Sequence, residues 1–384
     1  MNLNAHSPRF ALSAFMTIYT ISILLLLVLS YFELNVAMAP STKKALTLFA
    51  YIFLVLQMGL RWETGVDWVN NLDIFDSITN FSTVSPSSMN PEYGYNIAVW
   101  LIKLVFSSYS IFLLIHAAVY YYLIFDSIKR YTGMLFLPLM IFYCSTIGYT
   151  GSSRELIAVA IGVYGYRYLR DDKRLYFYLL VGLASLFHFS AVILFVFPLF
   201  NRKMRLPVLL LLLVCAVAIG TSQLPQILFG AVGNVLGGFA LLKADYYLAH
   251  SAGSVLESGL SIAGLLKRVM LLALFLYNRK ALSRKLRYYD LMLNAYIVGG
   301  VLYVLFANSL PIVIGRGSMY FDMLEPLLLA SQVHLLTLRS SRFVMATAMC
   351  VLSFFLFFKS IDLYPEWFIP YKGIFVNSDY IRQL

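Results

Sequence analysis

Long apolar runs alternate with short basic segments along most of the chain. Each of the clear runs approaches the roughly 20 apolar residues that a membrane-spanning helix needs. They cover residues 11–32, 45–60, 109–126, 132–149, 153–169, 206–220, 289–308, 314–337 and 343–360, with one more inside 258–283. The first run is too long for the apolar segment of a signal peptide, so we expect a retained anchor. The pattern predicts an all-α, polytopic integral membrane bundle.

Residues 175–201 are nearly continuous apolar sequence, but basic residues flank the run at both ends. Because Lys and Arg concentrate on the cytoplasmic side of membrane proteins, both ends should lie there. A single crossing would place the ends on opposite sides. We therefore predict two short helices, 175–187 and 190–201, which turn at 187–190 and carry His188 to the outer surface.

With this hairpin, the basic residues predict about 12 crossings and both termini on the non-cytoplasmic side. We expect one transmembrane domain over 1–384, with outer loops at 61–108 and 221–257 and an outer tail at 361–384. Within these loops, 95–104 is too short to span and is predicted to lie on the surface. Residues 225–242 are uncharged, but their proline and glycines favour a surface or re-entrant segment.

Composition agrees with this class of protein. The chain is 61% hydrophobic and 12% charged, whereas soluble domains are about 25% charged. This excludes an ordinary soluble enzyme. The net charge of +11 is normal for basic cytoplasmic loops and does not imply a nucleic-acid partner.

The first outer loop gathers residue types that suit a sugar site. Carboxylates accept hydrogen bonds from sugar hydroxyls, and aromatic rings stack on the C–H faces of sugars. The same aromatics also suit an interfacial belt, although all four tryptophans fall on the outer side in this topology. The candidates in the loop are Arg61, Trp62, Asp67, Trp68, Glu92 and Tyr95.

Two arginines open apolar runs near the predicted outer surface. Arg154 shares a helix face with the small residues Ala158 and Gly162, so it should point into the bundle. Arg316 has Tyr320 one turn further along. An intramembrane arginine is a functional candidate by default, with a structural pairing or an interfacial anchor as the alternative.

Three further features remain open between function and structure. Lys267 and Arg268 interrupt an apolar run, where snorkelling explains them as well as function does. Asp322 and Glu325 suit buried polar pairing as well as catalysis, and Pro326 should kink their helix. His188 could serve as a general base or as a hydrogen-bonded structural group.

Several kinds of site are excluded by the absence of their motifs. The sequence has no HExxH, no glycine-rich phosphate loop and no CxxC pair. Cys144, Cys215 and Cys350 are too few and too dispersed for a metal site. We expect no metal and no cofactor, and the short cytoplasmic loops exclude a nucleotide-binding domain of an ATP-driven pump.

The motifs, in this order, resemble those of the EpsG-like branch of the Wzy polysaccharide polymerases. The resemblance rests on Arg61-x-x-x-Gly65-x-Asp67, Glu92 with Tyr95, Arg154-x-x-x-Ala158, Phe187-His188-Phe189-Ser190-Ala191 and Arg316-x-x-x-Tyr320-Phe321. These motifs run from about residue 45 to 325. The family usually has a tyrosine where this chain has Trp68. Polymerases of this group resemble the C-type integral-membrane glycosyltransferases.

The resemblance implies an enzyme of the bacterial inner membrane with its active site facing the periplasm. Such a polymerase transfers a glycan from undecaprenyl diphosphate onto the non-reducing end of another lipid-linked repeat unit, as in O-antigen synthesis. Asp67, Glu92 or His188 would act as base. The arginines that would bind the diphosphate are Arg61, Arg154, Arg268 and Arg316. The aromatic residues that would contact the glycan are Trp62, Trp68, Tyr95 and Tyr320.

Two other classes stay open. A flippase or transporter of lipid-linked oligosaccharide needs polar residues through both leaflets, whereas the unusual charges here gather at one surface. An O-antigen ligase-like glycosyltransferase would share arginines and a histidine but use another acceptor. Beyond donor, acceptor and membrane lipid, the resemblance implies a chain-length regulator and a flippase of the same pathway as partners.

Overall fold

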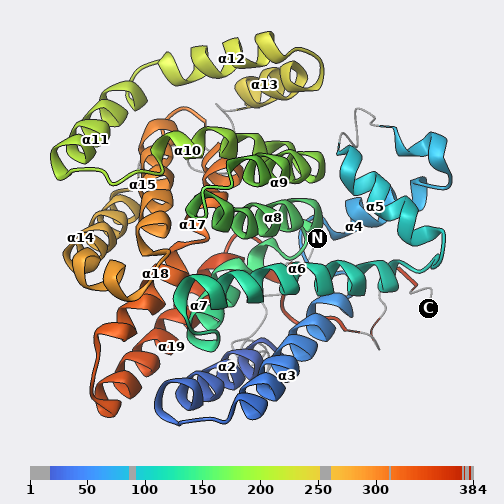
Figure 1. The fold of residues 1–384 in the computed structure, drawn as a ribbon. Coiled ribbons are helices and arrows are strands. Elements are labelled where there is room, and N and C mark those ends of the chain that lie inside the picture. Colours follow the sequence, from blue (N-terminus) through green and yellow to red (C-terminus); the bar gives the residue numbers. More distant parts are fainter. Residues whose placement is uncertain are drawn as a thin grey trace, which may run out of the picture. The chain divides into compact units, whose positions relative to one another are not determined.

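The computed structural model is helical throughout the part of the chain that it describes (Figure 1). The described residues are 18–85, 92–250, 261–310, 313–373, 376 and 380–381. The start of the predicted first span, parts of both predicted outer loops and part of the predicted outer tail lie outside them. Among the described residues there is no strand, as the apolar pattern predicts.

The chain divides into two compact units. The first comprises residues 1–85, 93–160 and 329–384, and the second comprises 86–92 and 161–328. The first unit contains α2 (Ile18–Asn35), α3 (Pro40–Gly59), α4 (Trp68–Ser77), η1 (Phe81–Val84), α5 (Tyr93–Lys103), α6 (Tyr109–Thr132), α7 (Phe136–Thr146), η2 (Ile147–Tyr149), η5 (Gln332–Leu335), α19 (Arg339–Ile361) and η6 (Pro365–Trp367). In this unit α3 packs on α6, while α2, α7 and α19 pack on one another.

The second unit is built around α15. It contains α9 (Arg174–Phe187), η3 (Phe189–Val196), α10 (Phe197–Phe200), α11 (Leu206–Gly220), α12 (Leu224–Leu236), α13 (Gly238–His250), α14 (Ile262–Lys285), α15 (Tyr289–Phe306), η4 (Ile314–Ser318) and α17 (Met319–Asp322). Helix α15 packs against α11, α14, α17 and η4. The unit boundaries fall within α8 (Ser153–Arg170) and α18 (Glu325–Ser331).

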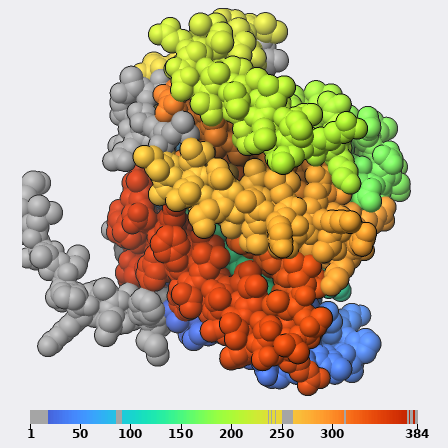
Figure 2. All heavy atoms as spheres, turned by 90° about the vertical axis from the view of Figure 1, so that its left-hand side faces the viewer, coloured from blue at the N-terminus to red at the C-terminus, as the bar shows by residue number. Residues whose placement is uncertain are grey.

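Four helices in the described residues are long and apolar enough to cross a membrane: α2, α6, α15 and α19. The pair α11 and α12, bent by 84°, makes a fifth if it is one broken span. Figure 2 shows α11 and α14 at the surface of the second unit. Their exposed side chains include Leu211, Val214, Leu266 and Met270, which suit lipid contact. The chain is thus a membrane protein, and the count of about 12 crossings stays a prediction.

The predicted turn at 187–190 is confirmed. Helix α9 ends at Phe187, and His188 adopts an extended backbone with φ −154° and ψ 122°. The chain then continues as η3, which packs against α9. The run 175–201 therefore forms a helical hairpin with His188 at its tip. Farther along, α12 and α13 also pack on each other, in the region predicted to be a surface or re-entrant segment.

The predicted span over 314–337 is helical as far as Leu335 but divided into short segments. This stretch begins with η4, a π-helical turn containing Gly315 and Gly317, and continues as α17 and α18. The helix breaks between Asp322 and Glu325. Pro326 lacks the backbone N–H that would continue the preceding helix, so its predicted kink is confirmed as a break.

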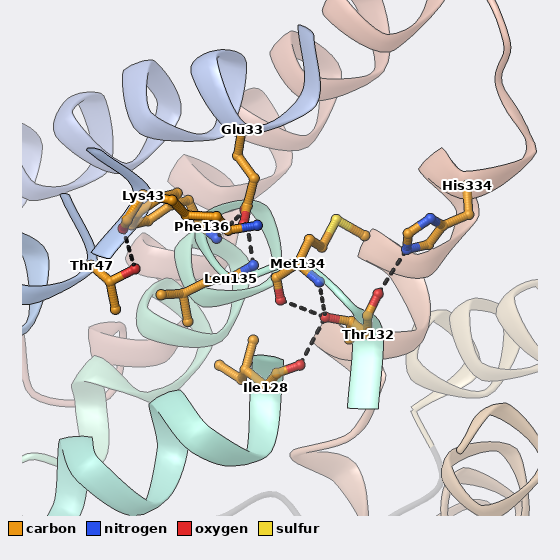
Figure 3. A network of polar contacts seen from close by, with 9 residues as sticks. All are labelled: Glu33, Lys43, Thr47, Ile128, Thr132, Met134, Leu135, Phe136 and His334. Carbon is orange, nitrogen blue, oxygen red and sulfur yellow. Dashed lines mark hydrogen bonds and ion pairs between the residues drawn. The ribbon is translucent and has the colours of Figure 1, made fainter. Parts of the chain in front are cut away.

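A buried carboxylate joins several helices of the first unit (Figure 3). Glu33 of α2 accepts hydrogen bonds from the backbone N–H groups of Leu135 and Phe136 at 2.8 and 2.9 Å, and it pairs with Lys43 at 3.1 Å. A carboxylate at the start of α7 satisfies N–H groups that the helix leaves unpaired. Nearby, His334 Nε2 donates to the Thr132 carbonyl at 2.7 Å. These bonds fix α2, α6, α7 and η5 within the unit.

Candidate active site

The first motif begins with a buried arginine. Arg61 follows α3 and is 2% exposed. Its Nη1 donates to the carbonyl of Met58, and its Nη2 donates to Ser153 Oγ at 3.1 Å. Burial lowers the pKa of Arg61 from its ordinary value, while arginine side chains remain protonated in proteins. The fork of Arg61 therefore holds a neighbouring segment of the protein.

The rest of the motif lies along that same segment. Asp67 Oδ2 accepts a hydrogen bond from Ser152 Oγ at 2.6 Å, and Asn71 Nδ2 donates to the Gly151 carbonyl at 2.7 Å. At Gly65 the backbone has φ +100°, and an added Cβ would lie 2.3 Å from the Cα of Gly151. The loop is thus bonded along residues 151–153, directly before Arg154.

Arg154 is the second residue of α8 and is half-buried. Ser153, which precedes it, accepts from His116 Nε2 through its backbone carbonyl at 2.8 Å, in addition to its bond with Arg61. Ala158, on the predicted inner face of α8, is fully buried. The helix start that carries Arg154 is therefore fixed from several sides.

The predicted sugar-stacking aromatics of this loop are buried. Trp62, Trp68 and Tyr95 are 2%, 0% and 0% exposed. The two indole rings meet edge to face with their ring centroids 4.7 Å apart, and the ring centroids of Trp68 and Tyr109 lie 5.7 Å apart. Trp62 Nε1 donates to the Tyr380 carbonyl at 2.8 Å. These contacts give the rings a packing role, and their stacking on sugars stays a prediction.

Two glutamates in the predicted outer loop are buried as well. Glu63 accepts from Lys372 Nζ at 2.8 Å and from the backbone N–H of Tyr380 at 3.0 Å, which ties the loop to the C-terminal segment. Glu92 is buried and directly precedes α5, within the short stretch 86–92 that belongs to the second unit. A role for Glu92 as base stays a prediction.

In the second unit, His188 belongs to a chain of hydrogen bonds. Its Nδ1 lies 2.7 Å from Ser190 Oγ, which lies 3.0 Å from the hydroxyl of Tyr320. Tyr166 donates to the Tyr320 carbonyl at 3.1 Å. Tyr320 is fully buried, and Gly162 leaves room for its ring. The hairpin tip is thus bonded to the segment that follows Arg316.

Arg316 lies in the π-helical turn η4 and is half-buried. Single π-helical turns recur at functional sites because they shift the side chains that follow relative to a regular helix. Here the turn separates Arg316 from α17, which begins at Met319 and carries Tyr320. The structure therefore joins the histidine motif and the second arginine motif in one cluster.

A set of four charged residues lies beside this cluster in the same unit. Arg268 donates both Nη groups to the carboxylate of Asp322 at 2.9 Å each, and Lys267 pairs with Glu325 at 2.6 Å. Ser318 donates to Asp322 Oδ2 at 2.8 Å. These bonds give Asp322 and Glu325 the polar pairing considered as the alternative to catalysis, within pairs that are only partly buried. Arg268 holds a carboxylate in this conformation.

Sequence reasoning missed the serines that connect these motifs. Ser152 and Ser153 directly precede Arg154, and Ser190 lies two residues after His188. Their position beside a motif residue is the sequence feature that could have identified them as connecting residues. Within the described residues, no group of three or more His, Cys, Asp or Glu side chains is placed to hold a metal ion.

We expect Gly65→Ala to misplace the first motif. The substitution combines a left-handed backbone, which costs about 1–3 kcal/mol for other residues, with a clash against the backbone of Gly151. Thermal unfolding in detergent should shift downward relative to the wild type. Gly182→Ala is the matched control, since nothing lies within 4 Å of an added Cβ there. An unfolding temperature of Gly65→Ala equal to that of the wild type would contradict the docking of this loop.

The helices and the two polar clusters define an all-helical membrane protein whose motif residues are bonded together within each unit. The model of the EpsG family matches residues 44–372, so the chain belongs to the EpsG family, the family of Wzy-like polysaccharide polymerases. The resemblance seen in the motifs is thereby confirmed. No curated protein and no solved structure matches the chain at a significant level.

Proposed function

We propose that this chain polymerises lipid-linked oligosaccharide repeat units at the periplasmic face of the bacterial inner membrane. It transfers a glycan from undecaprenyl diphosphate to the non-reducing end of another lipid-linked repeat unit. The family supplies the polymerase-type activity. The lipid carrier, the face of the membrane and the residue roles are our proposal, as is a fold related to the C-type glycosyltransferases.

One observation carries this proposal. Four motifs that lie far apart in sequence are bonded in two pairs. Asp67 accepts from Ser152, beside Arg154, at 2.6 Å. His188 is linked through Ser190 to Tyr320, which follows Arg316. Each pair combines a candidate base with a candidate phosphate-binding arginine, the combination that transfer from a sugar diphosphate requires.

In the proposed reaction the acceptor hydroxyl oxygen attacks the anomeric carbon of the donor sugar. The bond from that carbon to the diphosphate oxygen breaks, and undecaprenyl diphosphate leaves with the electron pair. Arginine suits this leaving group because its planar guanidinium binds phosphate oxygens in a bidentate manner. It also stabilises the negative charge that develops as the bond breaks.

Arg61 is set apart by its burial and Arg268 by its bidentate bond to a carboxylate. Arg154 and Arg316 are half-buried, so we assign the diphosphate contact to them. Arg61 is 2% exposed and bonded to Ser153, and Arg268 is bonded to Asp322. We therefore assign these two arginines to positioning. Arg61 orients the start of α8, and Arg268 orients the carboxylate beside the segment that carries Arg316 and Tyr320.

The acceptor proton needs one base. Asp67 is half-exposed, and among the described residues only its Oδ2 has a partner, so Oδ1 remains to accept from a sugar hydroxyl. In His188, an Nδ1–H donated to Ser190 would place the lone pair on Nε2, the tautomer that a base requires. We favour Asp67 as the base, with His188 as the second candidate.

A strain that lacks the gene for this chain would test the function. We expect lipid-linked single repeat units to reach the outer side while long polysaccharide disappears. Supplying the chain again should restore the length ladder on a gel. Loss of the single units as well would indicate a flippase, and retention of long polysaccharide that is no longer attached to its final acceptor would indicate a ligase. A chain-length regulator and a flippase are the expected pathway partners.

The membrane topology belongs to the same proposal. We expect about 12 crossings, with Ser85 in the periplasm and Arg284 in the cytoplasm. Single cysteines at these two exposed positions, in a background without Cys144, Cys215 and Cys350, test the orientation. An impermeant thiol reagent applied to intact spheroplasts should label only position 85. Labelling of position 284 would reverse the assignment.

A further inference from the structure

A basic cavity of about 290 Å³ lies in the second unit, apart from the residues proposed for glycan transfer. Its charged lining residues come from the ends of α8, α9 and α15 and from the segments that follow α8, α10 and α14, all within residues 161–328. Five carry positive charge and two carry negative charge, a formal balance of +3. The positive residues are Arg170, Arg174, Arg202, Lys203 and Arg287.

The two carboxylates of the lining, Asp172 and Asp290, can balance at most two of its five positive charges. Asp290 is already paired at 2.6 Å with Arg279, a residue that does not line the cavity. Within the described residues, no side-chain hydrogen bond or ion pair is made by Arg174, Arg202 or Lys203. Three cations around a concave space are thus available for an anion from outside the chain.

The other two arginines are fixed in place by the protein. Arg170 Nε donates to the Arg287 carbonyl at 3.0 Å, and Arg287 Nη2 pairs with Asp171 at 2.6 Å. Such bonds limit the side-chain entropy that ligand binding would otherwise cost. This part of the cavity is pre-organised, unlike a set of isolated surface lysines.

An uncharged donor points to the same kind of ligand. Ser283 Oγ lines the cavity and has no hydrogen-bond partner among the described residues. Buried polar groups are rarely left unpaired, so this hydroxyl calls for a partner, and it can donate to a phosphate oxygen. Asn294 also lines the cavity, but its Nδ2 already donates to Asn201 Oδ1 at 3.4 Å.

We propose that this cavity binds a phosphate-bearing anion. Guanidinium groups bind phosphate with strong, charge-assisted hydrogen bonds, and lysine adds a point charge. The ligand is either the headgroup of an anionic lipid or a soluble phosphate compound, which share this chemistry. The predicted topology places the cavity on the cytoplasmic side, opposite the proposed transfer site, so it is a second site.

The cavity is formed by both ends of the hairpin that carries His188. Arg174 begins α9, and Asn201 directly follows α10. Helix α15, which supplies Asn294, packs on α17 and η4. A bound phosphate would bridge the two ends of the hairpin to α15. We therefore expect occupancy to raise the thermal stability of the protein, a readout that needs no polymerisation.

The test compares two double variants of the full chain, each of which removes two exposed positive charges. Arg202→Gln with Lys203→Gln alters the cavity, whereas Lys280→Gln with Arg284→Gln alters α14 outside it. Two probes are used. Sodium pyrophosphate is titrated in neutral detergent, and its binding is measured as a shift in thermal unfolding. Lipid binding is measured in nanodiscs of phosphatidylglycerol or phosphatidylcholine, with native mass spectrometry of the lipid that the protein retains.

We expect the cavity variant to bind its ligand about tenfold or more weakly, as for loss of one charge-assisted contact, and the α14 variant to bind like the wild type. Stabilisation by pyrophosphate indicates a soluble ligand, and selective retention of phosphatidylglycerol indicates a lipid. Equal loss in both double variants would reduce the effect to general surface charge. Binding of neither probe by the wild type would also overturn the proposal. Since the readout is binding, failure here leaves the polymerase proposal untouched.

Discussion

Arg154→Lys and Arg316→Lys should each lose most polysaccharide elongation while the protein still inserts in the membrane. Lysine keeps the positive charge but lacks the planar fork that binds two phosphate oxygens at once. Loss of charge-assisted contacts of about 1.5–3 kcal/mol each at the leaving group predicts a rate decrease of about tenfold to a hundredfold.

The length ladder of the surface polysaccharide measures this effect at matched protein level. Arg339→Lys is the control, because Arg339 is exposed at the start of α19 and belongs to neither cluster. It should give a normal ladder. If Arg154→Lys and Arg316→Lys both give a normal ladder too, these arginines act only as interfacial anchors and the proposed phosphate contact is wrong.

Asp67→Asn should lower turnover about 10²–10⁴-fold, the usual contribution of a general base. The asparagine oxygen can still accept from Ser152, so the contact before Arg154 is kept while the basicity is lost. His188→Gln should stay within about tenfold of the wild type, because glutamine preserves a hydrogen bond to Ser190. Glutamine cannot act as a base, so retained turnover would mean that His188 is not the base.

Asp245→Asn provides the control, as Asp245 is an exposed carboxylate of α13 in the second predicted outer loop. It should elongate normally. The reverse pattern, with near-normal turnover in Asp67→Asn and collapse in His188→Gln, would move the base to the histidine and leave Asp67 as a positioning residue.

The sequence was most informative where basic residues constrained the topology. Basic flanks on both sides of 175–201 predicted a hairpin, and the structure has α9 and η3 turning at His188. Over 314–337 the apolar content predicted a span, and Pro326 predicted its kink, because proline cannot donate the next helical hydrogen bond. The π-helical turn at Gly315 and Gly317 was not predicted, although glycine weakens a helix.

Side-chain partners were harder to predict than motifs. Asp322 is bound by Arg268, 54 residues away, and Arg61 is bound to Ser153, 92 residues away. Hydropathy and spacing within one segment contain no information about such partners. The same limit applies to Trp62 and Trp68. Their residue type suits a sugar surface as well as a core, and only the fold shows that they pack on each other.

The most direct test of the central claim is chain elongation by the purified protein. Full-length chain in nanodiscs would be given undecaprenyl-diphosphate-linked repeat units as both donor and acceptor, and the products separated by length. We predict lipid-linked glycans that grow by whole repeat units, with release of one undecaprenyl diphosphate for each bond formed. Repeat units that stay single, with no undecaprenyl diphosphate released by an otherwise folded protein, would contradict the assignment as a polymerase.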